Sequence, residues 1–167
     1  MSDAAPKSSI DRVAADAARL GLSIEIKRLD QSTRTAEEAA QACGCAVGQI
    51  VKSLIFQEEP GGRLVLLLVS GRHNVDLDHM AAAHGLRLQR ADAKRVRQET
   101  GFAIGGVAPI GHLAPIDVFM DEALLGYDRV WAAAGRPDSV FAVESQALRA
   151  AIGAEVRSMT AELAGRQ

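Results

Sequence analysis

A lysine interrupts one of the most apolar stretches of the sequence. Lys52 lies within Ile50–Phe56, and the alternation of a β-strand places it on the same face as Leu54 and Phe56. Removing an ammonium group from water is costly unless a partner stabilises it or its pKa falls. Two interpretations remain open: Lys52 is held at a site for its chemistry, or it begins the strand and its amine reaches solvent. The first interpretation makes Lys52 a candidate catalytic residue.

A glycine-rich segment, Thr100–His112, is the second candidate for chemistry. Glycines such as Gly105 and Gly106 let main-chain N–H groups approach an anion closely. The segment lacks the lysine and hydroxyl of a phosphate-binding P-loop, and it lacks the strand-to-helix setting of a dinucleotide fingerprint. The pattern therefore predicts a loop that can bind negative charge, but it does not identify the ligand.

Other reactive side chains give weaker signals. A metal cluster could be drawn from His73, Asp76, Asp78 and His79. However, Asp76 fits a helix cap better, and the spacing matches no standard metal site. Cys43 and Cys45 lack the two-residue spacing of redox and zinc motifs, so a structural role is expected for them. We expect neither a metal nor a cofactor.

One stretch of the chain concentrates positive charge. Its basic residues are Arg87, Arg90, Lys94, Arg95 and Arg97. Such a stretch can bind the phosphates of a nucleic acid, or it can be a solvated helix face. The net charge of −2 and the pI of about 6.1 exclude a molecule coated in positive potential, so a nucleic-acid partner must meet a local patch. We expect no DNA partner.

Hydrophobic periodicity and turn residues predict the elements that carry these candidates. Helices are expected after Ser8 or Ser9 as far as Gly21, over Ala36–Cys43 after Thr33 or Thr35, from Asp76 to Gly85, from Asp92 to Gly101, and from Ser145 onward. Strands are expected at Ser23–Leu29, Ile50–Gln57, Arg63–Ser70, Leu86–Arg90, Ile116–Asp121, Arg129–Ala133 and Ser139–Val143. Phe102–Ala114 is expected to be a loop, and turns are expected at Glu58–Gly62 and Gly135–Asp138. This order predicts an α/β domain of the α+β kind, with a mixed, mostly antiparallel sheet flanked by helices.

The length and composition fit one globular domain. A chain of 167 residues with 48% hydrophobic residues can bury a core. Because only 4% of the residues are aromatic, this core must be mainly aliphatic. The first residues show no secretory signal, and no apolar run is long enough to span a bilayer. We therefore expect a cytoplasmic protein without a membrane partner. Residues 1–8 are expected to form a flexible N-terminus.

Two segments together resemble a known family. Gln49–Phe56, with Lys52, and Thr100–His112, with its Gly-Gly-x-x-Pro-x-Gly-His core, are similar to the motifs of freestanding aminoacyl-tRNA deacylases. This family includes YbaK and ProXp-ala and is related to the editing domain of bacterial prolyl-tRNA synthetases. The resemblance extends from Val13 to Ile152. It implies one deacylase domain, expected over residues 9–160, whose mixed sheet is flanked by helices.

The resemblance also implies roles for individual residues. Lys52 matches the lysine needed for activity, which would hold the ester end of the substrate or its terminal ribose and phosphate. Gly105 and Gly106 match a loop whose amides face the scissile carbonyl and would form an oxyanion hole. Pro109 and His112 close the motif, and His112 could hydrogen-bond either the loop or the substrate. Direct attack by water, assisted by the ribose hydroxyl, is expected because no side chain is an obvious nucleophile.

The end of one predicted strand departs from the family pattern. YbaK-like members tend to carry a serine and a second glycine where this chain has Ala133 and Ala134, just before Gly135. This strand end helps to shape the amino-acid pocket in the family. The change argues against strict cysteine specificity and suggests another small side chain, such as alanine, serine or threonine. The expected substrate is mischarged tRNA-Pro, with prolyl-tRNA synthetase as a further candidate partner. The alternative is a non-catalytic module that binds tRNA or a synthetase.

Overall fold

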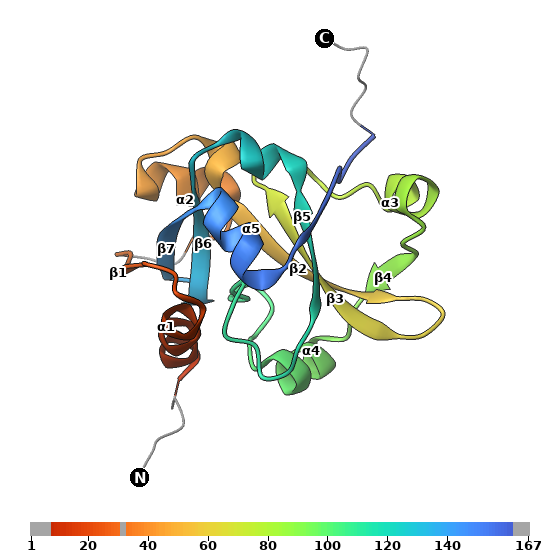
Figure 1. The fold of residues 1–167 in the computed structure, drawn as a ribbon, viewed down its shortest axis with the longest axis horizontal. Coiled ribbons are helices and arrows are strands. Elements are labelled where there is room, and N and C mark those ends of the chain that lie inside the picture. The colour runs from red at the N-terminus through yellow and green to blue at the C-terminus, as the bar shows by residue number, and fades with distance from the viewer. Residues whose placement is uncertain (1–7, 31–32, 162–167) are drawn as a thin grey trace.

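The structure is a computed structural model that describes residues 8–30 and 33–161 (Figure 1). The N-terminus predicted to be flexible, residues 1–8, lies outside the described residues except for Ser8, which caps the first helix. The helices are α1 Ser9–Leu20, α2 Ala36–Cys43, α3 Leu77–His84, α4 Ala93–Thr100 and α5 Ser145–Ile152, with short 3₁₀ turns at Val47–Gln49 and Glu122–Gly126.

Local capping chemistry decides where the helices begin and end. The Ser8 hydroxyl accepts a hydrogen bond from Asp11 N–H, and Thr35 does the same for Glu38 N–H, which settles both alternatives left open by the sequence. Asp76 and Asp92 cap α3 and α4 as predicted. Each of the five helices is followed by a glycine in the left-handed region. The helix predictions are therefore confirmed.

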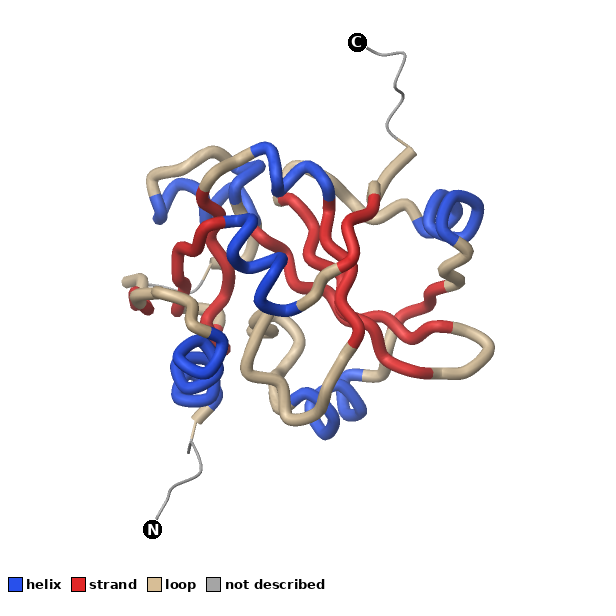
Figure 2. Tube along the Cα trace, in the orientation of Figure 1, coloured by secondary structure: helices blue, strands red, loops and turns tan. Residues whose placement is uncertain are grey.

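The strands form two sheets (Figure 2). One sheet has the order β1-β7-β6, and the other has the order β4-β2-β3-β5-β8. All pairs are antiparallel except β3 with β5 and β5 with β8. The strands are β1 Ile26–Arg28, β2 Val51–Glu58, β3 Arg63–Ser70, β4 Leu88–Arg90, β5 Asp117–Asp121, β6 Arg129–Arg136, β7 Ser139–Glu144 and β8 Glu155–Arg157. The predicted α+β class with mostly antiparallel pairing is confirmed.

Four details differ from the sequence-based expectation. The sheet is divided in two, and β1 keeps only three of the residues predicted from Ser23 to Leu29, because only these pair with β7. β6 continues to Arg136, through part of the predicted turn, by an irregular register against β7. β8 was not predicted, since its three residues form a strand only by pairing with β5.

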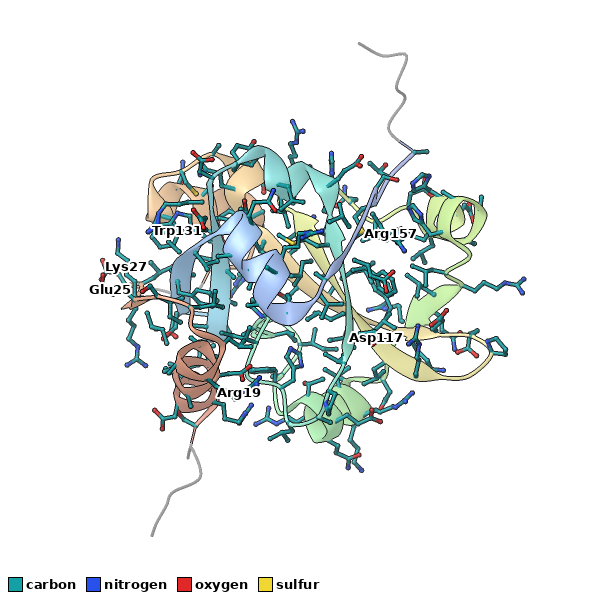
Figure 3. The ribbon with its side chains drawn as sticks, viewed as in Figure 1. Arg19, Glu25, Lys27, Asp117, Trp131 and Arg157 are labelled. Atoms are coloured by element: carbon teal, nitrogen blue, oxygen red, sulfur yellow. The ribbon has the colours of Figure 1, made fainter. Side chains whose placement is uncertain are left out.

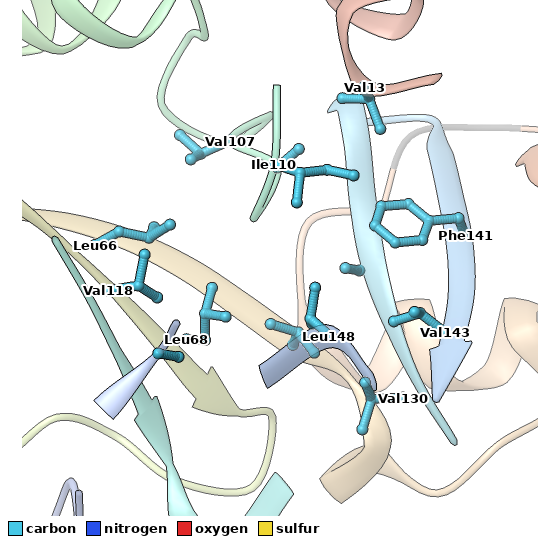
Figure 4. Close-up of a cluster of buried hydrophobic side chains, with 14 of the residues drawn as sticks. Val13, Leu66, Leu68, Val107, Ile110, Val118, Val130, Phe141, Val143 and Leu148 are labelled. Atoms are coloured by element: carbon cyan, nitrogen blue, oxygen red, sulfur yellow. The ribbon is translucent and has the colours of Figure 1, made fainter. Parts of the chain in front are cut away.

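The main core lies between the two sheets and is covered by α1, α5 and the glycine-rich loop (Figure 4). Val13 of α1, Ile110 of the loop, Phe141 of β7 and Leu148 of α5 belong to it. A second cluster lies on the other side of β2 and β3, against α3. Because β2 and β3 contribute to both clusters, both are central strands, as their apolar sequences predicted.

Among the described residues, no helix combines the length and the apolar character needed to cross a membrane.

Candidate active site

A cavity of about 440 Å³ lies between β2 and β6, next to the bridge that pairs Ile50 with Trp131. Its walls come from β2, the start of α2, the glycine-rich loop and the β6–β7 hairpin. The residues that line it include Thr35, Lys52, Ser53, Gly105, Trp131 and Ala133. The volume falls within the range of about 300–1,000 Å³ that is usual for small-molecule sites. The two segments singled out in the sequence therefore meet at one cavity.

Lys52 reaches the cavity from the second position of β2. Its ammonium donates to the main-chain carbonyl of His73 and, at 3.5 Å, to Oδ1 of Asn74. Burial lowers the pKa of Lys52, and the carboxylates of Glu37 and Asp121 oppose that shift. An ammonium has three donors, so these two partners leave one N–H for a substrate. Lys52 thus begins the strand, as one interpretation assumed, but its half-buried amine is held at the site.

A buried carboxylate organises the turn that holds Lys52. Asp121 is fully buried, and its Oδ2 accepts a hydrogen bond from Ser70 N–H at 3.0 Å. The same oxygen lies 2.9 Å from Nδ1 of His73, the residue whose carbonyl accepts from Lys52. The lysine is therefore oriented by a chain of contacts that ends in the core, which favours a fixed position for its charge.

The two glycines predicted to form an oxyanion hole have different surroundings. Gly105 has φ +97°, lines the cavity, and has no acceptor for its N–H within residues 8–30 and 33–161. Gly106 donates its N–H to the carbonyl of Ala103 at 2.9 Å and packs against Gly135. The expectation for the pair is thus corrected: the Gly105 amide is available to a ligand, and the Gly106 amide closes the turn that shapes the loop.

Pro109 and His112 support the loop and do not line the cavity. Pro109 is buried. His112 donates from Nε2 to the carbonyl of Ala108 at 2.7 Å, and its ring meets Phe102 edge to face with centroids 5.0 Å apart. Burial lowers the pKa of His112, which favours the neutral imidazole. Of the two roles open to His112, hydrogen bonding to the loop is the one observed.

The end of β6 brings one of its three predicted residues to the cavity. Ala133 lines the cavity, whereas Ala134 points to the opposite face and is fully buried in the main core. Gly135 has φ +104°, and its carbonyl accepts a hydrogen bond from the Ser9 hydroxyl of α1 at 2.7 Å. Of the three residues, only Ala133 lines the cavity, and the register of β6 against β7 becomes irregular just after it.

Several lining residues were not identified from the sequence. Trp131 stands two positions before Ala133, so the alternation of the strand could have revealed it. Lys27 does not line the cavity but lies beside Trp131 (Figure 3), with its Nζ 5.8 Å from the ring centroid. Thr35 was predicted as a cap but not as a wall of the cavity. Ser53 contributes a buried hydroxyl that has no hydrogen-bond partner in the described part of the chain.

The basic stretch divides into different environments. Arg90 lines the edge of the cavity, and Lys94 and Arg97 are exposed on α4. Arg95 is already engaged, because it donates to Glu99 at 2.6 Å and to Gln57 at 3.0 Å. Arg87 is exposed. The exposed members remain candidates for phosphate contact, whereas Arg95 has partners within the protein.

The weaker sequence signals have structural explanations. Asp76 accepts a hydrogen bond from His79 N–H at 3.0 Å as the cap of α3. The described residues contain no group of three or more metal-ligating side chains placed to hold an ion. Cys43 and Cys45 are not joined in a disulfide, and burial raises the pKa of Cys43 to about 11. A thiol with such a pKa is a poor nucleophile at neutral pH.

The chain is similar to several known proteins. Residues 30–151 match the model of the aminoacyl-tRNA editing domain. The uncharacterized protein YwhH of Bacillus subtilis is 29% identical over 115 residues, which cover 69% of this chain and 73% of that protein. Proline--tRNA ligase of Thermosipho melanesiensis is 32% identical over 94 residues, which cover 56% of this chain but 16% of the ligase. A solved structure provisionally described as a trans-editing enzyme for prolyl-tRNA synthetase is 44% identical, with a TM-score of 0.84, and the match covers 95% of this chain and 99% of that one.

Proposed function

The chain belongs to the aminoacyl-tRNA editing family, and from this premise we propose that it hydrolyses wrongly charged tRNA-Pro that carries a small amino acid. It is an aminoacyl-tRNA deacylase. The proposal adds the identity of the tRNA and the size of the amino acid. One observation carries the hydrolysis: the cavity is lined both by Lys52 and by Gly105, whose main-chain N–H has no acceptor among the described residues.

The reaction breaks the ester that joins the amino acid to the terminal ribose. Water adds to the carbonyl carbon, the carbon–oxygen bond to the ribose breaks, and the ribose oxygen takes a proton. Negative charge develops on the carbonyl oxygen, where the N–H of Gly105 is the donor that we assign to it. Removing one such donor typically slows an enzyme by about 100- to 1,000-fold. The neighbouring ribose hydroxyl of the substrate assists the water, since the described residues that line the cavity include no aspartate, glutamate or histidine to act as a base.

Lys52 supplies the positive charge of the site. Its remaining N–H is assigned to the ester end of the substrate or to the terminal ribose and phosphate. The apolar environment that lowers its pKa also strengthens its attraction to an anion. Binding the developing charge more strongly than the ground state is what accelerates the reaction.

The walls of the cavity favour a small side chain. Ala133, with Ala36, Ala39 and Ala132, lines the space together with Trp131. A pocket gains only about 1–3 kcal/mol per methylene, so a synthetase admits amino acids smaller than its own and a second site must remove them. We assign alanine, serine, threonine or cysteine as the amino acid. Likeness to prolyl-tRNA ligase and to a trans-editing protein supports tRNA-Pro as the carrier and prolyl-tRNA synthetase as a partner, in the cytoplasm where charged tRNA is used.

Replacement of Lys52 distinguishes the deacylase hypothesis from the hypothesis of a non-catalytic binding module. Wild-type protein should release the amino acid from labelled mischarged tRNA-Pro, and Lys52→Ala should slow release by at least about 100-fold. Arg149→Ala, which removes one exposed positive charge on α5, is the matched control and should leave the rate unchanged. The Lys52→Ala protein should stay folded, because water can replace the lysine ammonium as the hydrogen-bond donor to the carbonyl of His73 and the side-chain amide of Asn74.

Binding and melting measurements complete the test. Tight tRNA binding by both proteins without release of any amino acid would instead support the non-catalytic module. Unchanged release by a folded Lys52→Ala protein would remove this lysine from the mechanism.

A further inference from the structure

Arg12 of α1 reaches into the base of the glycine-rich loop. Its Nη2 donates to the carbonyl of Gly101 at 2.6 Å, and its Nε donates to the carbonyl of Gly111 at 3.1 Å. Its guanidinium carbon also lies 4.9 Å from the centre of the Phe102 ring. A single side chain therefore connects two points of the loop that are ten positions apart in the sequence.

The two anchor points are fitted closely to α1. A Cβ at Gly101 would lie 2.5 Å from Nη2 of Arg12, and a Cβ at Gly111 would lie 3.0 Å from the main-chain nitrogen of Val13. Both glycines also have positive φ values, of +84° and +83°. The loop thus approaches the helix at both positions as closely as the absence of side chains permits.

Further contacts from α1 support the same loop. Asp16, one turn after Arg12, accepts a hydrogen bond from Gly111 N–H at 2.8 Å. Val13 and Ile110 both belong to the main core (Figure 4). In the middle of the loop, Gly106 packs against Gly135, whose carbonyl accepts a hydrogen bond from the Ser9 hydroxyl. The helix therefore contacts the loop directly at its base and indirectly beside Gly105.

We propose that Arg12 is a positioning residue for deacylation, because it fixes the loop that presents the Gly105 amide to the cavity. The inference rests on the proposed function of that cavity. It assigns a catalytic purpose to α1, which lies outside the residues 30–151 that match the editing-domain model. Arg12 does not line the cavity, so it acts on the reaction through the loop and not by contact with the substrate.

The geometry needs an arginine. The planar guanidinium presents several N–H donors in a fixed fork, and two of them reach carbonyls on opposite ends of the loop. A lysine has one charged nitrogen on a flexible stem, so it can bind either carbonyl but cannot hold the same planar arrangement over Phe102. Arg12→Lys should therefore retain part of the effect.

The test measures single-turnover and steady-state deacylation by Arg12→Ala. A displacement of about 1 Å in a catalytic group can cost about 100-fold in rate, so kcat should fall by about 10- to 100-fold while KM changes little. Guanidinium chloride at millimolar, non-denaturing concentrations should restore part of kcat by filling the vacated space, and urea at the same concentrations should not. Arg12→Lys should lie between the wild type and Arg12→Ala. Arg149→Ala, an exposed arginine of α5, should show neither the loss nor the response to guanidinium.

The possible outcomes are distinguishable. An unchanged kcat in folded Arg12→Ala overturns the inference, and so does a loss that guanidinium does not reduce at temperatures well below the melting midpoint. If Arg12→Ala does not fold, Arg12→Lys decides the question, and a wild-type kcat for that variant overturns the inference. If the wild type itself deacylates no tRNA, the proposed function fails instead.

Discussion

Lys52 and Gly105 come from very different backbones, a central strand and an irregular loop, and the fold brings them to one cavity. Lys52 could be predicted from the sequence because removing an ammonium from water costs free energy, and an apolar strand that nevertheless contains one indicates a functional role. The distinction between Gly105 and Gly106 could not be predicted. It depends on the hydrogen bond from Gly106 to Ala103, and the sequence does not specify this turn.

His112 shows how a motif residue can act through structure. Its Nε2–H is donated to Ala108, and its Nδ1 is buried without a partner among the described residues. Protonation would place a second N–H, and a positive charge, in that buried position, with Arg12 nearby. The sequence left the choice between loop and substrate open because a histidine can serve either.

The lowered pKa of His112 predicts a pH dependence of stability. Between the folded pKa and the ordinary value of about 6.5, the unfolded state binds more protons than the folded state. The stabilisation is therefore complete above the ordinary value and is lost as the pH falls through the folded value. Urea unfolding at about pH 7 and pH 5 should show a larger loss of unfolding free energy for the wild type than for His112→Gln, which keeps a donor for Ala108. Equal losses for the two proteins would show that His112 is not the group responsible.

At the scale of elements, helices were predicted more accurately than strands. The residues that start and stop α1 to α4 act within a few positions of each helix, so Thr35, Asp76 and Asp92 can be identified locally. A short strand depends on a distant partner. β8 pairs with β5 over only Glu155–Arg157, and nothing in those residues indicates the pairing.

The same difference explains the uneven prediction of the site. Lys52 was identified from its place in an apolar strand, whereas Ala133, Ala134 and Gly135 were grouped by sequence proximity. In the structure β6 extends through all three, but Ala133 lines the cavity whereas Ala134 is buried in the main core. The link between α1 and the loop was not predicted, because Arg12 and its acceptors are 89 and 99 positions apart.

At the scale of the whole molecule, an acidic protein must bind a polyanion. The net charge of −2 gives no general attraction to tRNA, so affinity must come from local positive charge and from recognition of the acceptor end. Arg90 lies at the cavity edge, and Lys94 and Arg97 follow on α4. These exposed residues are the candidates for phosphate contact.

This arrangement predicts the effect of removing charge from α4. Replacing Lys94 and Arg97 together by alanine should weaken tRNA binding and reduce the logarithmic salt slope by roughly 0.7 to 0.9 for each phosphate that is no longer neutralised. The rate at saturating substrate should not change, since neither residue lines the cavity. Replacing Arg149 and Arg157 together by alanine removes the same charge elsewhere and should leave affinity and slope unaltered. Equal behaviour of the two double variants would make α4 a solvated face and place tRNA docking elsewhere.

The identity of the cleaved amino acid is the most direct test of the central claim, that this cavity edits wrongly charged tRNA. The measurement is the rate of amino-acid release from tRNA-Pro charged with alanine, serine, threonine, cysteine or proline. We predict rapid release of at least one of the four small noncognate amino acids and little release of proline. Release of proline at the same rate as the others, or no release from any of the five substrates, would contradict the account.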